Sequence, residues 1–387
     1  MEATPILQVL KYHEETKHHS HRYARAMRAL DWATQPAPFR SYAGAAPVLL
    51  PLLHQDPEGE HLDLYERTRN TFWDFNLKSI GAFLELSLGL SAWKALPDST
   101  SRWALRMNPS SGNLHPTEAH LLLPAMDGAL RYQSVAGTSV APGLYHYNAY
   151  SHALEPRARW PSGYGERVRS HFQSPGFLIG LSHIAWREAW KYGERALRYC
   201  HHDTGHALAA LSLAGNLLGW KVTALTSLST ADAETVLGFP AVTWPLEEEE
   251  RADLLLFVSP AGHRAIGRGL PQDLLDAFKR LTLEGAPSVL SPHHVEWPII
   301  PETERAAAKP RTPEGSVSFE APSLLEHPVS VLSGAALIRR RRSAVAMDGE
   351  TTLQATQFLA MLDKTLPRNG VAPFDLEVGE PDRKSVV

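Results

Sequence analysis

The segment that most constrains the fold spans residues 193–220, because its apolar residues cover most of the circumference of a helix. Apolar residues recur there in steps of three and four, and Leu208, Leu213 and Leu217 lie beside that stripe. The stripe itself consists of Leu197, Cys200, Ala207, Leu211, Ala214 and Leu218. A surface helix carries a single apolar face, whereas this wider pattern predicts a helix that is buried on several sides.

Short β-like runs alternate with this helix. They are residues 120–124, 143–148, 177–184, 222–228 and 254–258, of which the last has the sequence of a buried strand. The apolar spacing also predicts a helix over 77–93 and, behind a capping box of Ser229 and Asp232, a short helix over 233–237. This alternation predicts a mixed α+β or α/β domain.

Composition defines the broad class of the protein. Of its 387 residues, 43% are hydrophobic and 21% charged, which excludes disorder over most of the length. Lys and Arg number 38 against 42 Asp and Glu, so the chain lacks the positive surplus of a nucleic-acid-binding protein. The single cysteine, Cys200, excludes internal disulfides and cysteine-rich metal sites, and we expect it to be a core residue.

No apolar stretch approaches the ~18 residues of a membrane span. The first residues also lack the basic head and apolar core of a secretion signal. We therefore expect a cytoplasmic protein without a membrane partner.

Proline and arginine content divides the chain. We expect an N-terminal extension over 1–58, a main domain over 59–270, a proline-rich linker over 271–329 and a further segment over 330–387. The last segment contains four arginines, 339–342, followed by an apolar helical pattern. These arginines fit a nucleic-acid-binding patch or the opening of a second domain, and the second interpretation is favoured because Arg341-Arg342-Ser343 repeats Arg69-Asn70-Thr71.

The densest polar cluster is residues 108–118, which contain two serines, two asparagines and one glycine within six positions. Such a loop can present donors and acceptors to a planar ligand. The same residue types also form ordinary Asx-type turns. The residue types alone leave both interpretations open.

Four motifs in one order resemble the FMN-dependent nitroreductase superfamily, specifically its SagB-type dehydrogenases, which include flavin oxidases that turn peptide azolines into azoles. They are Arg-x-Thr (69–71), Pro-Ser-Ser-x-Asn-x-x-Pro (109–116), Gly-Leu-Tyr-His-Tyr (143–147) and Lys-Tyr-Gly-Glu-Arg with Asp-x-Gly-His (191–206). The resemblance covers about 60–262 and implies an α+β fold with a central, mainly antiparallel sheet flanked by helices. It also implies FMN as the cofactor.

The resemblance implies a role for two residues of the first motif. Arg69 and Thr71 match positions that hold the FMN phosphate and ribityl chain, a role that suits a bidentate guanidinium. Family members often carry a second cation where this chain has Trp73, and Arg67 is our candidate to replace it. The alternative is that Arg69 is a solvated surface charge.

The later motifs imply contacts with the flavin ring and with the reacting proton. Ser110, Ser111 and Asn113 match positions that contact the ring and the ribityl group. Lys191 and Tyr192 match a pair proposed as acid and base in the azoline-oxidising branch, where a partly desolvated lysine would have its pKa drawn toward neutrality. The alternative is a solvated lysine beside a packing aromatic residue.

These implied roles predict an FMN-dependent oxidoreductase with a ping-pong cycle. One substrate, a small molecule or a modified peptide, would deliver a hydride to FMN, and oxygen or another second substrate would reoxidise the flavin. Nitro or quinone reduction with NAD(P)H as the hydride donor is the same cycle run with different partners. Flavin sites of this family lie where two halves or two subunits meet, so the incomplete second repeat predicts a homodimer. The rival is an inactive FMN-binding or peptide-binding scaffold.

A metal hydrolase is a further alternative. His202 and His206 lie four apart with Asp203 between them, which resembles a metalloprotease helix with Asp in place of Glu. Against this stand Gly205 between the histidines and the lack of an identifiable third ligand. We therefore expect no metal.

Overall fold

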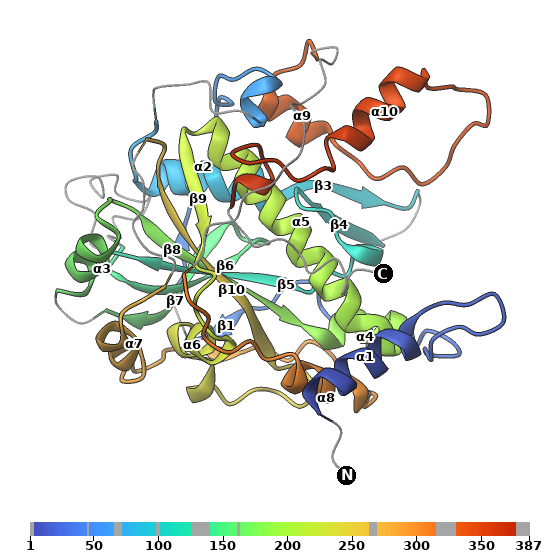
Figure 1. The fold of residues 1–387 in the computed structure, drawn as a ribbon, viewed down its shortest axis with the longest axis horizontal. Helices are drawn as coiled ribbons and strands as arrows, with labels where there is room; N and C mark the ends of the chain where they lie inside the picture. The colour runs from blue at the N-terminus through green and yellow to red at the C-terminus, as the bar shows by residue number, and fades with distance from the viewer. Residues whose placement is uncertain are drawn as a thin grey trace.

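An antiparallel sheet forms the centre of the molecule (Figure 1). The computed structural model describes residues 4–44, 46–65, 72–97, 101–124, 140–160, 163–262, 269–314 and 330–376. Among these residues the sheet has seven strands, ordered β2 (Val48–Leu49), β7 (Ala153–Arg159), β6 (Gly143–Asn148), β5 (Thr117–Leu123), β8 (Phe177–Ile184), β10 (Glu250–Pro260) and β9 (Trp220–Ala224). Every neighbouring pair is antiparallel, as expected.

The central strands are buried on both faces. Along β8, Phe177, Ile179 and Leu181 belong to one core, whereas Leu178 belongs to the core on the opposite face. Successive side chains of a strand point to opposite faces, so a strand covered on both sides has a continuous apolar sequence. This is why the runs at 177–184 and 254–258 lack polar alternation.

Helices cover the two faces. The first core contains residues of α2 (Leu77–Ser87) and α5 (Ala196–Leu217). The second contains residues of α3 (Tyr164–Phe172), α6 (Thr230–Val236) and α7 (Gln272–Phe278). The prediction of a long, largely buried helix is confirmed by α5, which runs diagonally through Figure 1. The capping box of Ser229 and Asp232 at α6 is also confirmed.

Two predicted boundaries are wrong. The helix expected over 77–93 ends at Ser87, and residues Leu90–Ala95 form β3, which pairs with β4 (Arg102–Arg106). Gly89 follows the C-cap residue Leu88, a position where glycine commonly ends a helix. The strand expected over 222–228 is β9, which begins at Trp220 and ends at Ala224.

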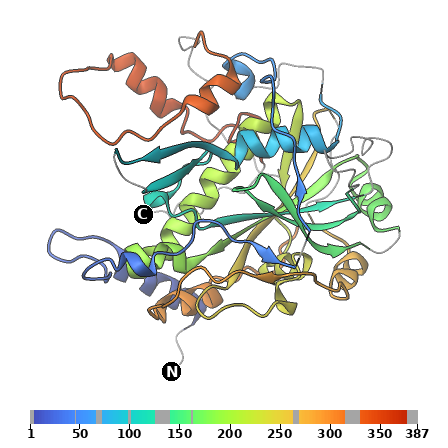
Figure 2. The ribbon, with the colours of Figure 1, turned by 180° about the vertical axis from the view of Figure 1, so that it is seen from behind.

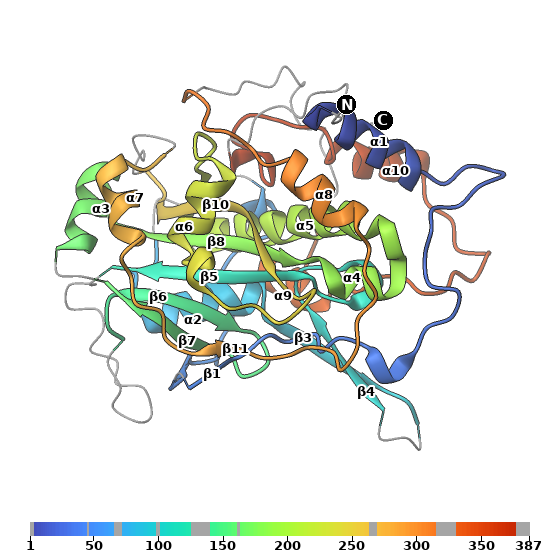
Figure 3. The ribbon, with the colours of Figure 1, turned by 90° about the horizontal axis from the view of Figure 1, so that it is seen from below.

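The segments outside the main domain pack onto it. Helix α1 (Pro5–Thr16) lies along α8 (Ile299–Ala306), as Figures 1 and 3 show. Strand β1 (Tyr42–Ala43) pairs with β11 (Ala286–Pro287). In its described residues the proline-rich segment contains three short elements, α7, β11 and α8, consistent with the prediction that prolines exclude long ones.

The C-terminal segment contributes two helices. Leu337 and Ile338 of α9 (Gly334–Arg340) pack against the first core. By contrast, α10 (Ala355–Asp363) lies at the periphery in Figures 1 and 2, and its Phe358, Leu359 and Met361 are exposed.

Short connecting elements complete the fold. One further α-helix, α4 (Ala185–Tyr192), follows β8 directly. The 3-10 helices are η1 (Trp32–Thr34), η2 (Leu62–Leu64), η3 (Ser111–Asn113), η5 (Gly193–Arg195), η6 (Phe239–Ala241) and η7 (Phe374–Leu376). In the described part of the chain, no helix has the length and apolarity needed to cross a bilayer.

Candidate functional site

Strand pairing brings the polar loop next to the Lys-Tyr motif. Strand β5 pairs with β8 so that Thr117 lies opposite His183, and the Ile184 amide donates to the Pro116 carbonyl at 3.0 Å. The loop 108–116 leads into the start of β5, and α4 begins at the end of β8. Because β5 and β8 are antiparallel, these two points lie at the same end of the strands. Two motifs that are about 80 residues apart in sequence are thereby neighbours.

Gly112 is the point of closest approach between the loop and α4. Its φ is +59°, and a Cβ at this position would lie 2.5 Å from Tyr192 Oη and 3.1 Å from Lys191 Nζ. Asn113 also has a positive φ, of +61°. The loop is therefore a tight turn whose backbone fits directly against both predicted catalytic side chains, and only glycine has room there.

Asp203 of α5 anchors the loop. Its carboxylate is buried and accepts the Ser111 amide at 2.9 and 3.0 Å and the Ser111 hydroxyl at 2.8 Å. A carboxylate with several such donors holds a loop firmly, because charge-assisted hydrogen bonds are the stronger kind. In the sequence, Asp203 belongs to the Asp-x-Gly-His motif of the family resemblance and to the possible metal motif. Its spacing from the loop gave no signal of this contact.

The other two predicted loop residues have internal bonds and remaining capacity. Ser110 Oγ accepts the His115 amide at 2.8 Å, and Asn113 Nδ2 donates to the Ala104 carbonyl at 2.9 Å. The Ser110 hydroxyl hydrogen and Asn113 Oδ1 have no partner among the described residues and could bond a ligand. Both side chains are half-buried at the surface of the loop.

Glu188 is a buried carboxyl group one helical turn before the Lys-Tyr pair. It is fully buried, and neither carboxyl oxygen has a hydrogen-bond partner in the part of the chain that the structure describes. Burial, together with the charge of Asp203, raises the pKa of Glu188 well above its ordinary value. The protonated form of Glu188 is therefore favoured relative to that of an exposed glutamate. Its i, i+3 and i, i+4 spacing to Lys191 and Tyr192 was the sequence signal that we missed.

The environment of Tyr192 favours its protonated form. Burial, followed by the nearby Glu188 and Tyr199, raises the pKa of Tyr192 to about 12. The side chain thus keeps its proton at neutral pH and is suited to donate it.

A cavity of about 220 Å³ lies beside the loop, between α2, α5 and the end of α9. Its lining is mainly apolar and includes Met107, Pro109, Leu213 and Ile338. The small residues Ala209 and Ala210 form the α5 side. A mainly apolar cavity with a few polar groups at its edge is the usual form of a small-molecule site.

Arg341 supplies the charge at the edge of this cavity. Its guanidinium donates to the carbonyls of Arg106 and Met107 at 3.3 and 3.2 Å, while its buried Nε has no acceptor among the described residues. Burial and the neighbouring Arg342 lower the pKa of Arg341, and a nearby anion would stabilise its charged form. The sequence identified Arg341 as part of a repeat, and its position beside the 108–116 loop was not predicted.

Three predicted cofactor residues, Arg67, Arg69 and Thr71, lie outside the described residues. The metal alternative gains no support. His206 Nδ1 lies 3.7 Å from Asp203 Oδ1, but the described ranges contain no group of three or more His, Cys, Asp or Glu residues that could hold a metal.

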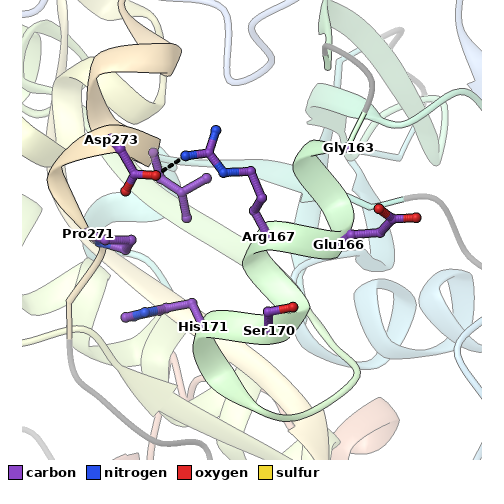
Figure 4. A pocket seen from close by; sticks show the side chains of 8 residues that line it. Gly163, Glu166, Arg167, Ser170, His171, Pro271 and Asp273 are labelled. Carbon is purple, nitrogen blue, oxygen red and sulfur yellow. Dashed lines mark hydrogen bonds and ion pairs between the residues drawn. The ribbon is translucent and has the colours of Figure 1, made fainter.

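A second hollow, of about 510 Å³, lies between α3 and α7 (Figure 4). Arg167 and Asp273 form an ion pair across it, and His171 Nε2 lies 2.9 Å from the Gly269 carbonyl oxygen. None of the predicted site residues lines it in the described part of the chain. It is therefore separate from the site at the loop.

No model of a protein family matches the sequence, and no curated protein matches it. Among solved structures, the chain is similar to a protein from Anabaena variabilis assigned as a nitroreductase. The two share 21% identity at a TM-score of 0.57, over 89% of this chain and 65% of that one. This chain thus spans less than two thirds of the Anabaena protein.

Two weaker similarities were also found. A chain of the E. coli microcin synthetase McbBCD complex, solved with truncated pro-MccB17 bound, has 17% identity, covers 67% and 84% of the two chains and has a TM-score of 0.35. A protein from Ralstonia eutropha assigned as a nitroreductase has 14% identity, covers 61% and 97% and has a TM-score of 0.37. The Anabaena similarity, with the antiparallel sheet and its flanking helices, shows that the chain has the nitroreductase-like fold.

Proposed function

We propose that the protein is an FMN-dependent oxidoreductase of the nitroreductase type, related to the SagB-type dehydrogenases. The observation that carries this proposal is the contact of the Gly112 turn with Lys191 and Tyr192. The loop and the Lys-Tyr motif are far apart in sequence, and a loop that served only as an Asx-type turn would not need to contact Lys191 and Tyr192. Their contact favours the ligand-loop interpretation of residues 108–118.

The described residues fit FMN. The apolar cavity beside Pro109 suits the face of a flavin ring, and the unpaired Nε of Arg341 suits a phosphate group. Ser110, Ser111 and Asn113 would contact the ring and ribityl group, and Arg67, Arg69 and Thr71 would hold the phosphate side, as the family resemblance implies. When bound, FMN would accept a hydride from one substrate and then donate it to the other, as a ping-pong cycle requires.

The residues of this chain would position the substrate and handle its proton. Tyr192 keeps its proton at Oη, because its pKa is raised. Lys191 Nζ lies near this oxygen, since both atoms approach the same Gly112 turn. Asp203 fixes that turn through Ser111, so the donor and acceptor atoms of the loop stay in place when substrates exchange. The substrate would be a small molecule or a modified peptide. Oxygen would be the second substrate if the first donates the hydride, and NAD(P)H would be the hydride donor if the small molecule or peptide is reduced.

We also propose that the active form is a homodimer. Helix α10 exposes Phe358, Leu359 and Met361, three large apolar side chains on one short helix at the periphery of the molecule. A second subunit would cover such a face. The main domain of 59–270 with a partial repeat over 330–387 remains our proposed domain organisation.

The test begins with the visible spectrum of the purified full chain after incubation with FMN. We expect oxidised-flavin bands at about one FMN per subunit, lost in Asn113→Ala. Tyr192→Phe should retain FMN but lose about 10²-fold in the rate at which NAD(P)H reduces an organic acceptor, because reduction of the acceptor consumes a proton and the variant removes one proton donor. Tyr199→Phe, whose ring lies 4.5 Å from that of Tyr192, is the matched control and should keep its rate. A chain that takes up no FMN would refute the proposal.

A further inference from the structure

A cavity of about 380 Å³ lies between α4, α8 and the loop that precedes β10. Helix α4 contributes Ala185, Trp186 and Ala189 to it. In the described residues, its lining includes neither Lys191 nor Tyr192, nor any residue of the 108–116 loop. The cavity is therefore distinct from the proposed flavin site, and no step of the proposed reaction uses it.

Three tryptophans from separate segments line this cavity: Trp186, Trp244 and Trp297. Trp186 is held rigidly, since its Nε1 donates to Ser291 Oγ at 2.7 Å and its ring lies 4.9 Å from that of His294. Indole faces carry negative electrostatic potential and bind organic cations better than other aromatic rings do. An aromatic lining of this kind therefore selects for a cationic or a flat apolar group.

The charged residues of the lining favour the cation. Arg251 is already paired, with Glu249 at 2.7 Å and with Glu304 at 3.7 Å. Glu247, in contrast, has no hydrogen bond or ion pair with any residue that the structure describes, although it is partly buried. The remaining cation of the lining, Arg305, is exposed on α8. An uncompensated carboxylate is thus left beside the three indole rings.

A buried anchor fixes the wall that carries Glu247. The adjacent Glu248 is fully buried and accepts the Leu290 and Ser291 amides at 2.8 to 2.9 Å. It also lies 2.8 Å from His294 Nε2 and pairs with the buried Arg40. These contacts join the two loops on either side of the cavity, so its shape exists before a ligand arrives.

We propose that this cavity binds an organic cation, a guanidinium or alkylammonium group, between the indole rings and the carboxylate of Glu247. The group could belong to a free amine or to a basic side chain of a peptide, since both present the same chemistry. This proposal does not depend on the flavin proposal.

Isothermal titration calorimetry on the full chain tests it with argininamide and with its neutral isostere citrullinamide, both used with the α-amino group acetylated so that only the guanidinium carries charge. We expect argininamide to bind about tenfold more tightly or better, because the charge contributes through both the carboxylate and the rings. Tetramethylammonium should also bind. Equal affinity for argininamide and citrullinamide, or no heat from any of the cations, would overturn the proposal.

Two variants that change the charge of the cavity in opposite directions provide a second test. Glu247→Gln should weaken argininamide binding about tenfold, whereas Arg305→Gln should strengthen it by removing a like charge from the rim. Glu302→Gln, on α8 but outside the lining, is the matched control and should change affinity less than about twofold. If Glu247→Gln is misfolded by circular dichroism, Trp244→Phe replaces it, with a smaller loss expected because phenylalanine binds cations less strongly. Unchanged affinity in the folded variant contradicts the proposal.

The source of the cation is distinguished by a blocked tripeptide, acetyl-Gly-Arg-Gly-amide. Tighter binding of the tripeptide than of argininamide would identify a basic peptide as the ligand class. The reverse order would identify a free amine. Loss of FMN binding in Asn113→Ala with unchanged argininamide binding would show that the flavin site and the cation site are independent of each other.

Discussion

Ser111 gives both its amide and its hydroxyl to the carboxylate of Asp203, at 2.8 to 3.0 Å. Asp203 lies on the helix that crosses the sheet, and Ser111 lies on the loop that precedes β5. A double-mutant cycle of Ser111→Ala and Asp203→Asn should therefore show a coupling free energy of about 1 kcal/mol or more in urea unfolding.

The neighbouring serine provides the control for this cycle. Ser110 bonds the His115 amide and makes no recorded contact with Asp203, so Ser110→Ala and Asp203→Asn should be additive within about 0.5 kcal/mol. Coupling of equal size in both cycles would mean that the loop responds as a whole and that Asp203 is no specific anchor.

Gly112→Ala should weaken FMN binding about tenfold or more, because the new methyl group would displace Tyr192 Oη and Lys191 Nζ. Gly163→Ala is the matched control. Gly163 also has a positive φ, of +82°, but a Cβ there would meet nothing within 4 Å. Both variants should lose about 1–2 kcal/mol of stability from backbone strain. Flavin titration should separate them, and equal affinities would show that the contact is unimportant.

Glu188→Gln should stabilise the protein at neutral pH. The folded-state pKa of Glu188 is raised, so the native state retains a proton that the unfolded state loses above its ordinary pKa of 4.5. Wild-type stability therefore falls as pH rises from that value, and the glutamine variant lacks this loss. The melting temperature of the variant should exceed that of the wild type by more at pH 8 than at pH 5.

A second buried glutamate gives the contrast. Glu85 accepts the Leu53 amide at 2.8 Å and pairs with Arg339 at 2.6 Å, so Glu85→Gln should destabilise at both pH values. A Glu188→Gln variant that behaved in the same way would mean that the Glu188 carboxyl is ionised and paired in solution.

Arg341→Gln should reduce affinity for FMN about tenfold and leave affinity for riboflavin unchanged, since only FMN carries the phosphate that the guanidinium would meet. Arg340→Gln removes an exposed arginine of the same cluster and should affect neither ligand. An equal loss for FMN and riboflavin would assign Arg341 a purely structural role through its bonds to Arg106 and Met107.

His183 should make stability depend on alkaline pH. Burial alone would lower the pKa of His183, but the carboxylates of Asp253 and Glu304 outweigh it and raise the pKa to about 10. The stabilisation is fully present below the ordinary pKa of 6.5 and is lost as pH rises through about 10.

Urea unfolding of wild type and His183→Gln between neutral and alkaline pH measures this effect. The wild type should lose up to about 1.4 kcal/mol per pH unit more than the variant. The variant should be less stable at neutral pH, because Asp253 loses its buried partner. Parallel pH curves would show that His183 is neutral in the folded state.

The sequence was informative wherever a residue's neighbours in the chain decide its environment. The strands at 143–148 and 177–184 and the Ser229–Asp232 capping box are all local patterns, and the structure confirms them. The helix over 77–93 failed because Leu88 and Leu90 fit both a helical and a strand period.

The contacts of the site could not be read from local patterns. Asp203 meets Ser111 only because β5 pairs with β8, and Arg341 reaches the carbonyl of Met107 from more than 200 residues away. The burial of Glu188 depends likewise on how α4 and α5 pack. The roles of Lys191, Tyr192 and the loop residues remain predictions, to which the structure adds their proximity.

The register of Thr117 against His183 has a kinetic consequence. Strand β8 joins partners that lie about 60 residues before it and about 70 residues after it, so the middle of the sheet consists of contacts with high sequence separation. Proteins dominated by such long-range contacts fold slowly, because the entropy of loop closure is lost before the contacts contribute favourable free energy. The turn at Gly112 and the end of α4 meet only when this pairing has formed. Competence to bind a ligand at the loop should therefore appear late in refolding, together with the last slow phase, and not with the early formation of α5.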